Sequence, residues 1–427
     1  MRLLKPKPDN RYKGNLFVAV SLNYVSLIRR YWPMLGFGLI TVFWGNFGQS
    51  FFISWFGAAI QRELNLTATT YGLTYSAATV ISGLSIMILG GLIDKIKIQH
   101  FVLLSSTGLF LAALFMSQVQ SVSMLLLAFF MLRFFGQGLL PHTSGTAMSK
   151  YFSSNRGKAL SISSNGVPLG EALLPAIAVA LIAAIGWQHT WLVVAITVPL
   201  LFLPMALWLL KISGPAEAEQ TTYSHTAAGQ ADGSRRTLLT DRRFWCALPL
   251  VLMPPFSVTG IFIHQGFILE QKHWSSTLFA LTFTVYGVIH WCASFVTGPL
   301  IDRYSATRLF SFLGVPFAIG LILTGSLNHV YMAFVMMIMM GLGMSMMGSV
   351  VGSMWAEVYG TANLGSIRSL ITSLIILSTS ASPILLGFLI DHGMTANQLL
   401  TALGTYALIS TILSLFSYHR RIAIPRR

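Results

Sequence analysis

The chain has 427 residues, of which 54% are hydrophobic and only 9% are charged. Its mean hydropathy is +0.70, whereas soluble domains carry about 25% charged residues. This composition and the many long apolar runs exclude a set of soluble domains and predict an integral membrane protein. The net charge is +15, so the distribution of basic residues along the chain needs an explanation.

Twelve runs of roughly 20 apolar residues predict twelve membrane-spanning helices. Helices are favoured over a β-barrel because the runs are continuously apolar rather than alternating, and a helix satisfies its own backbone in lipid. The expected spans are 34–60, 70–92, 100–118, 122–148, 158–185, 189–210, 244–269, 278–301, 307–326, 330–355, 365–390 and 396–417. The predicted fold class is therefore an all-α integral membrane protein of two pseudo-symmetric six-helix bundles.

A polar stretch divides the chain near its middle. It runs from Ser213 to Arg243 and has too little apolar content to pack a core, so we expect a linker there. Just after it, Pro249, Pro254 and Pro255 predict a bent seventh helix. The predicted organisation is a tail at 1–30, a six-helix bundle at 31–211, the linker at 212–243, a second six-helix bundle at 244–418 and a tail at 419–427.

Basic residues gather on one side of the predicted membrane. If both termini are cytoplasmic, 24 of the 27 Lys and Arg residues lie on the cytoplasmic side, while Arg62 and Lys272 lie on the outer side. This positive-inside pattern predicts a multi-pass protein of the cell membrane, or of the inner membrane in a bacterium, with both termini cytoplasmic. It also explains the net charge without a nucleic acid partner.

A short motif occurs twice, each time where an apolar run ends. Gly90-Gly91-Leu92-Ile93-Asp94-Lys95 reappears 208 residues later as Gly298-Pro299-Leu300-Ile301-Asp302-Arg303. Tyr151 and Tyr359 are separated by the same offset, so the two halves look like copies of one unit. Duplicated membrane halves are typical of secondary transporters.

With twelve spans, a long middle loop and this motif in both halves, the chain resembles the major facilitator superfamily over nearly its whole length. The resemblance implies that the two bundles rock against each other and that contacts of the repeated motif form and break during gating. The gating residues implied in this way are Asp94, Lys95, Arg156, Asp302 and Arg303. A second interpretation, in which both aspartates only terminate helices, stays open.

A second motif is similar to one branch of that superfamily. The segment from Tyr151 through Arg156 to Gly166 and Gly170 resembles the loop and fifth-helix signature of the branch of monocarboxylate porters and oxalate-formate antiporters. The first span departs from that branch, because 43–48 reads Phe-Trp-Gly-Asn-Phe-Gly in place of an acidic, glycine-rich opening.

Among Asp, Glu, Lys and Arg, only Arg133 and Glu171 lie deep in predicted spans. Each is roughly 15 to 20 Å from the end of its span, near the middle of a ~30 Å hydrocarbon core. An isolated charge there costs at least about 2.5 kcal/mol, so both should face a cavity or each other. The segment 133–138 resembles the fourth-helix arginine motif of the superfamily, which is linked to proton coupling.

Two interpretations of Arg133 and Glu171 stay open. In the first, Glu171 carries the coupled proton, and Arg133 is alternately its partner and the anchor of a substrate carboxylate. Burial favours a neutral carboxyl group and a nearby cation favours a charged one, so the protonation of Glu171 would depend on conformation. In the second, the two side chains form a fixed ion pair between the fourth and fifth helices.

Other polar side chains in the spans could line a central cavity. His264 and His290 titrate in a useful range, although a histidine in a membrane more often serves as an interhelical hydrogen-bonding group. The expected substrate-binding residues are Arg133, Asn46, Gln49, His264, Gln265, Tyr286 and His290.

The sequence contains neither a glycine-rich phosphate loop nor paired metal-ligand motifs, so we expect no cofactor, no metal and no enzymatic activity. The preferred prediction is proton-coupled symport of a small organic solute, a carboxylate-bearing metabolite, by a monomer in the lipid bilayer. An exporter of drugs or metabolites, or a carrier of zwitterionic solutes such as amino acids, is the alternative on the same fold. A membrane enzyme or receptor is the third class.

Overall fold

The computed structural model describes residues 24–89, 93, 95–152, 155–213, 238–360 and 364–418, and every element in these ranges is a helix. The first half of the chain contains α1 (Tyr24–Gly45), η1 (Asn46–Gly48), α2 (Ser50–Glu63), α3 (Ala68–Leu89), α4 (Ile98–Met116), α5 (Val122–Met131), η3 (Leu132–Leu139), α6 (Leu140–Tyr151), α7 (Arg156–Ser164), α8 (Gly166–Thr197), η4 (Val198–Phe202) and α9 (Leu203–Ile212). The second half contains α11 (Arg242–Ile263), α12 (Gln265–Lys272), α13 (Ser276–Tyr304), α14 (Ala306–Phe310), α15 (Gly314–Ser326), α16 (Met332–Met346), η5 (Met347–Val351), α17 (Gly352–Tyr359), α18 (Leu364–Asp391) and α19 (Ala396–Ser414).

Ten helical stretches of the described chain are long and apolar enough to cross a membrane. The longest, Arg156–Ile212, is two spans, because the chain turns back at Gly186. Gly186 has a φ of +80°, which glycine adopts without the strain of a Cβ atom. The first predicted span is divided among α1, η1 and α2 and completes the set of twelve. The predicted all-α membrane fold is confirmed.

Large apolar side chains cover the outer surface of the helices. Met87, Ile88 and Leu200 are each at least two-thirds exposed. Contiguous exposed apolar surface is unfavourable in water, but it matches the hydrocarbon of a bilayer. The protein is a multi-pass membrane protein.

The seventh span is interrupted, but not at its prolines. α11 continues as a helix through Pro249, Pro254 and Pro255, and the chain leaves helical geometry at His264, where φ is −103° and ψ is 20°. α12 begins at the next residue. The break therefore places His264 and Gln265 between two helical segments.

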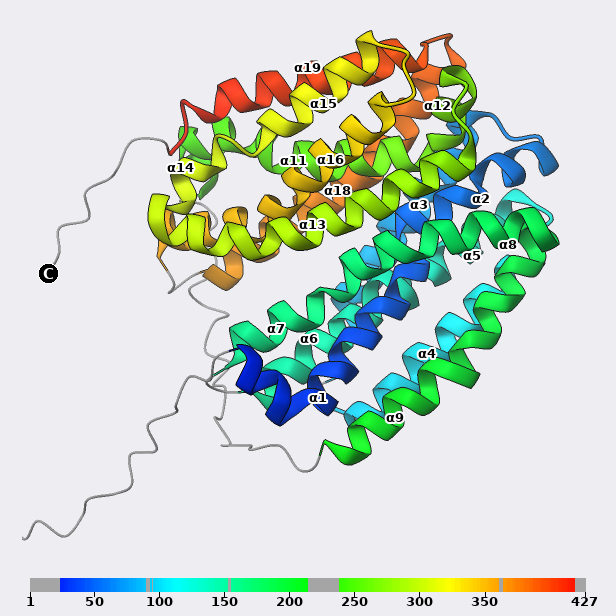
Figure 1. Ribbon diagram of the computed structural model, residues 1–427, viewed down its shortest axis with the longest axis vertical. Helices are drawn as coiled ribbons and strands as arrows, with labels where there is room; N and C mark the ends of the chain where they lie inside the picture. The colour runs from blue at the N-terminus through cyan, green and yellow to red at the C-terminus, as the bar shows by residue number, and fades with distance from the viewer. Residues whose placement is uncertain are drawn as a thin grey trace, which may run out of the picture.

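The two halves form separate groups of helices that contact each other along two seams (Figure 1). In one seam α3 packs against α18, and in the other α8 packs against α13. α2 also contacts α11 and α12 near the end of the molecule that holds Ala68, Gln265 and Asp391, which we call the closed end. Most of the predicted linker, at 214–237, lies outside the described residues, so the domain boundaries stay predictions.

Candidate functional site

The seam between α8 and α13 brings the backbones of the two halves into close contact. A Cβ atom on Gly287 would lie 2.5 Å from the backbone nitrogen of Ala172 and 2.7 Å from the carbonyl oxygen of Pro168, so only glycine fits there. Next to this contact, the hydroxyl of Thr284 donates a hydrogen bond of 2.8 Å to the carbonyl oxygen of Ala172. This close packing fixes the register between α8 and α13.

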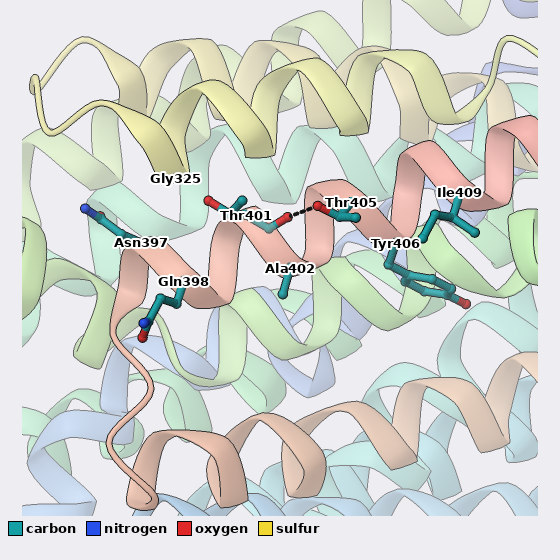
Figure 2. A pocket seen from close by; sticks show the side chains of 8 residues that line it. All are labelled: Gly325, Asn397, Gln398, Thr401, Ala402, Thr405, Tyr406 and Ile409. Carbon is teal, nitrogen blue, oxygen red and sulfur yellow. Dashed lines mark hydrogen bonds between the residues drawn. The ribbon is translucent and has the colours of Figure 1, made fainter.

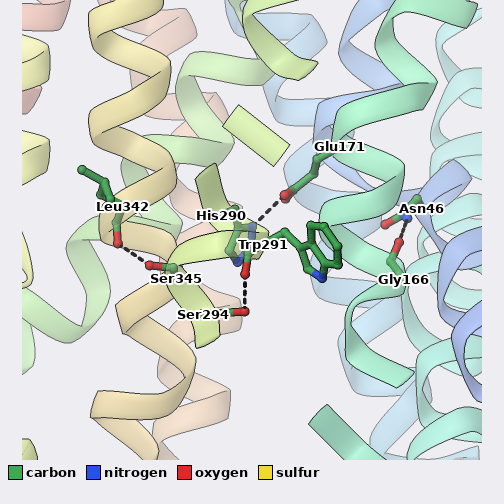
Figure 3. A network of polar contacts seen from close by, with 8 residues as sticks. All are labelled: Asn46, Gly166, Glu171, His290, Trp291, Ser294, Leu342 and Ser345. Atoms are coloured by element: carbon green, nitrogen blue, oxygen red, sulfur yellow. Dashed lines mark hydrogen bonds and ion pairs between the residues drawn. The ribbon is translucent and has the colours of Figure 1, made fainter. Parts of the chain in front are cut away.

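That register places Glu171 opposite His290. Glu171 lies midway between Arg156 and the turn at Gly186, and His290 lies at the middle of α13. The Nδ1 atom of His290 is 2.7 Å from Oε2 of Glu171, and the two side chains are 16% and 6% exposed (Figure 3). A buried carboxylate and an imidazole therefore join the two halves near the middle of their helical spans.

Tyr286 and His290 lie on one face of α13, one turn apart. Their rings are 5.9 Å apart, and the hydroxyl of Tyr286 is buried without a hydrogen-bond partner among the described residues. Tyr286 and His290, both expected in the substrate site, are thus neighbours. His290 is engaged by Glu171, whereas the Tyr286 hydroxyl still needs a partner.

Arg133 lies apart from Glu171 in this structure. It is in η3, a π-helical segment of the fourth span, and its guanidinium lies 5.1 Å from the centre of the Tyr75 ring. Such contact with an aromatic face stabilises a cation by roughly 0.5 to 2 kcal/mol. No ion pair joins Arg133 to Glu171 within the described chain, and Oε2 of Glu171 contacts His290 instead. The contact expected from the sequence is therefore not made in this state.

Asn46 and Gln49 flank the break in the first span. The side-chain nitrogen of Asn46 donates a 2.8 Å hydrogen bond to the carbonyl oxygen of Gly166, while its Oδ1 is buried without a described partner (Figure 3). Gln49 is half-buried and leads into α2. Gly48 packs directly against the backbone of η3 at Gly136. The break thus lies beside the segment that carries Arg133.

His264 and Gln265 lie at the closed end, in the break between α11 and α12. A ring nitrogen of His264 is 2.8 Å from the carbonyl oxygen of Pro383, so this histidine has a structural hydrogen bond. Gln265 is 1% exposed and neither side-chain polar atom has a partner among the described residues. Both line a cavity of about 720 Å³ whose described lining contains none of Arg133, Glu171 and His290.

A second hollow, of about 640 Å³, runs along α19 (Figure 2). Its lining includes Thr401 and Thr405, and the hydroxyl of Thr405 is already bonded to the carbonyl oxygen of Thr401 at 2.8 Å. The described lining contains no charged residue and none of the residues expected to bind substrate. The described lining of this hollow therefore lacks the charged and titratable side chains that lie between the two halves.

The described residues among those expected in gating lie at the end opposite the closed end. Lys95, Arg156, Asp302 and Arg303 are exposed, and Asp94 lies outside the described residues. The Nε atom of Arg156 donates a 3.1 Å hydrogen bond to Ser149, and the guanidinium of Arg303 lies 5.2 Å from the centre of the Tyr304 ring. Their predicted role as latches stays a prediction.

At the closed end, Asp391 makes a contact between the two halves. Its two carboxylate oxygens accept hydrogen bonds of 3.0 and 2.8 Å from the backbone nitrogens of Ala68 and Thr69. These are the first two residues of α3, where unpaired N–H groups and the helix dipole favour a negative charge. Asp391 therefore links the last turn of α18 in one half to the first turn of α3 in the other.

Sequence reasoning missed Asp391 and the pairing of Glu171 with His290. Asp391 directly follows the predicted span 365–390, so an acidic residue at the end of a span was the available signal. The pairing has no such signal, because its partners are 119 residues apart and meet only through the packing of α8 on α13.

An all-helical membrane chain of two similar halves, with a buried carboxylate at the seam between them, is typical of secondary transporters. The Major Facilitator Superfamily model matches residues 35–264 and again 255–425, so the chain belongs to this family. Each half is matched separately, which agrees with the repeated motif. A comparison with the curated proteins finds no match.

Solved structures share the fold at low sequence identity. A mutant form of the nucleoside transporter NupG has a TM-score of 0.71 and 11% identity, and the match covers 90% of this chain and 99% of that one. A bacterial homologue of the human lysosomal transporter Spinster, in an inward-facing and unoccupied conformation, has a TM-score of 0.63 and 15% identity, covering 91% of this chain and 95% of that one. At these identities the comparisons show the fold alone.

Proposed function

We propose that this protein is a secondary active transporter that moves a small organic solute across the cell membrane by alternating access. Membership of the Major Facilitator Superfamily supports this proposal, as does the contact between the two halves at the closed end. The positive-inside pattern supports cytoplasmic termini, so the closed end faces outward. The described state then corresponds to one that is shut toward the outside.

The contact between Glu171 and His290 carries the proposal of proton coupling. The carboxylate and the imidazole are 2.7 Å apart, and this contact requires α8 and α13 to pack against each other. When the seam opens, the carboxylate and the imidazole separate, and each then takes or loses protons by itself. The conformational change therefore alters how many protons Glu171 and His290 bind. In this proposal Glu171 carries the coupled proton, and His290 replaces Arg133 as its partner.

The position of Arg133 supports a carboxylate-bearing substrate. Arg133 is buried and has no carboxylate partner within the described chain, since Glu171 is bound to His290. A buried cation favours an anionic ligand that can share its charge through two parallel hydrogen bonds. The resemblance of 151–170 to the branch of monocarboxylate porters and oxalate-formate antiporters agrees with this class. We also propose that the repeated motif, with Asp94 and Asp302, latches the opposite end when it closes.

The proposed function is tested by reconstituting the purified protein into proteoliposomes with an imposed pH gradient. Labelled monocarboxylates, dicarboxylates, amino acids and cationic dyes are offered in parallel. We expect accumulation of a carboxylate, and we expect Glu171→Gln to abolish gradient-driven accumulation while leaving exchange partly intact. Extrusion of cations without movement of carboxylates would reject the anionic substrate, and unchanged pH dependence in Glu171→Gln would remove this residue as the proton carrier.

A further inference from the structure

The first half exposes two tryptophans that contact each other at the end opposite the closed end. Trp32 lies near the start of α1 and Trp208 near the end of α9, and their rings are 6.0 Å apart at an angle of 54°. The two residues are 48% and 52% exposed. Both lie at the ends of predicted spans, 34–60 and 189–210, where tryptophan places its apolar ring against hydrocarbon and its N–H toward the headgroups. The pair therefore marks the level of the lipid headgroups.

The ends of α1 and α9 are held together behind this pair. The hydroxyl of Tyr151 donates a hydrogen bond of 2.7 Å to the carbonyl oxygen of Ser213, which directly follows α9. The ring of Tyr31 in α1 lies edge to face with that of Tyr151, with ring centres 6.2 Å apart. One side chain of the fourth span thus contacts both helix ends, so the exposed pair is a fixed part of the first half.

Two basic side chains lie next to the tryptophans in the chain. Lys211 follows Trp208 by three residues, which places both on the same side of α9, and Arg29 precedes Trp32 by three residues. Both bases are exposed, and neither forms an ion pair with Asp or Glu in the described chain. They are therefore available to an anion from outside the protein.

The described part of the first half has no acidic side chain at this end. Its acidic residues are Glu63, which lies at the closed end, and Glu171, which lies in the seam. The second half differs at the start of α11, where the exposed Trp245 donates its indole N–H to the carbonyl oxygen of Leu239 at 2.9 Å and Asp241 lies close in the chain. A positive surface beside exposed tryptophan thus distinguishes the first half.

The chain before Trp32 also has an apolar surface outside the span. α1 leaves helical geometry at Tyr31, where φ is −123° and ψ is 25°, so the segment 24–30 is set off from the rest of the helix. On this segment Val25 and Ile28 are 59% and 45% exposed, and Arg29 lies beside them. Exposed apolar and basic side chains on one short helical segment are typical of chain that lies in the headgroup layer.

We propose that the ends of α1 and α9 form a binding site for an anionic phospholipid. Arg29 and Lys211 bind its phosphate, while Trp32 and Trp208 cover the glycerol group and the first carbons of the acyl chains. Arginine and lysine are the usual phosphate-binding side chains, and a soluble anion would leave the tryptophans uncovered. The site lies on the lipid-facing surface and is independent of the proposed function.

Native mass spectrometry of the full-length protein in a neutral detergent tests this site. Dioleoyl phosphatidylglycerol is the anionic probe, and dioleoyl phosphatidylcholine has the same acyl chains without net charge. We expect the first phosphatidylglycerol to bind about tenfold more tightly than phosphatidylcholine, since each base near a membrane surface favours anionic lipid. The double variant Arg29→Gln, Lys211→Gln should remove this preference. Lys97→Gln with Arg308→Gln, the same loss of charge at exposed positions on the same side, should keep it.

Two further measurements separate a lipid from a soluble anion. Trp208→Leu should weaken the binding of both lipids, because it removes the aromatic contact and leaves the two bases in place. Glycerol 3-phosphate, at the concentration of the lipid, should not displace phosphatidylglycerol. The site is rejected if the two lipids bind alike or if the control double variant loses the preference to the same extent. Displacement by glycerol 3-phosphate would show a site for soluble phosphate instead.

Discussion

Within the described part of the chain, two carboxylates, those of Glu171 and Asp391, each contact the opposite half, and their surroundings differ. Glu171 is buried near the middle of its span and contacts a side chain, His290, at 2.7 Å. Asp391 is exposed at the closed end and binds the backbone N–H groups of Ala68 and Thr69. Both contacts hold the same two halves together.

The difference shows which contact can respond to protons. Imidazole changes its charge between about pH 5 and 8, so the contact of Glu171 with His290 depends on protonation. Backbone N–H groups do not titrate, so the contact of Asp391 is constant over that range. Removing one partner of a buried charged pair costs about 3 to 5 kcal/mol, whereas losing a helix cap costs about 1 kcal/mol. Under the proposed function, proton coupling is therefore assigned to the buried contact, and the exposed contact stabilises the state in which the closed end is shut.

The largest effect is expected from His290→Leu, which leaves the Glu171 carboxylate buried without its partner. The described state should lose about 3 kcal/mol or more, measured as thermal stability of the protein in nanodiscs. Acidic buffer should restore part of the loss because it neutralises carboxylates, and the second change Glu171→Gln should restore it at all pH values. His189→Leu, at an exposed histidine that binds its own helix, is the matched control. Equal losses in the single and double variants would show that the pair is not coupled.

A smaller effect is expected from Gly287→Ala in the seam between α8 and α13. The new Cβ would meet backbone atoms of Ala172 and Pro168, which cannot move aside, and such overpacking costs about 1 to 3 kcal/mol. Gly298→Ala in the same helix is the control, because nothing lies within 4 Å of its Cβ position.

The readout for this seam is the distance between spin labels on the two halves. Labels at Gln118→Cys and Thr277→Cys are placed in a chain whose native thiols are removed by Cys246→Ser and Cys292→Ser. Gly287→Ala should broaden the distance distribution toward longer values. A distribution that matches Gly298→Ala would contradict the close packing of the seam.

Asp391→Asn should shift the same label pair by less. Losing the charge that caps the N-terminus of α3 destabilises the described state by about 1 kcal/mol. The fraction of molecules in which the halves have separated at this end then increases about fivefold. Glu63→Gln is the control, since this carboxylate lies at the same end but binds Trp187 and Gln188 of its own half. If Asp391→Asn and Glu63→Gln lengthen the label distance equally, the contact of Asp391 with the other half does not hold this end shut.

The smallest effect is expected from Asp302→Asn. Asp302 is exposed in this structure, and exposed charges contribute about 0 to 1 kcal/mol. If it acts as a latch only when its own end closes, the variant should favour the described state, the reverse of Asp391→Asn. The same label pair would then show a narrower distribution. A shift toward longer distances would argue against the latch.

The fold could be predicted from the sequence. Its twelve spans are recognised from local apolar composition, and its two halves from the motif repeated at Asp94 and Asp302. In lipid the backbone N–H and C=O groups must be hydrogen-bonded within the protein, so a long, continuously apolar run forms a membrane-spanning helix. The position of Glu171 near the middle of its span followed in the same way from its distance to the span ends.

The partners of these residues could not be predicted. Glu171 meets His290 rather than Arg133 because Gly287 lets α13 lie directly on α8, and that packing is a property of two distant segments. The sequence also did not show where the seventh span breaks, because the break lies at His264 and not at the prolines that predicted a bend. The burial of the Gln265 amide without a partner depends on how α12 packs against α2, which the sequence does not show.

The cap made by Asp391 has a consequence for the time the protein spends in each state. Its donors are main-chain amides at the start of α3, which have no acceptor in their own helix. Whenever the halves part at that end, these two amide hydrogens become available for exchange with deuterated water. Their exchange rate in the native, unlabelled chain therefore reports how much of the time this end of the molecule is open, without the need for a transported solute.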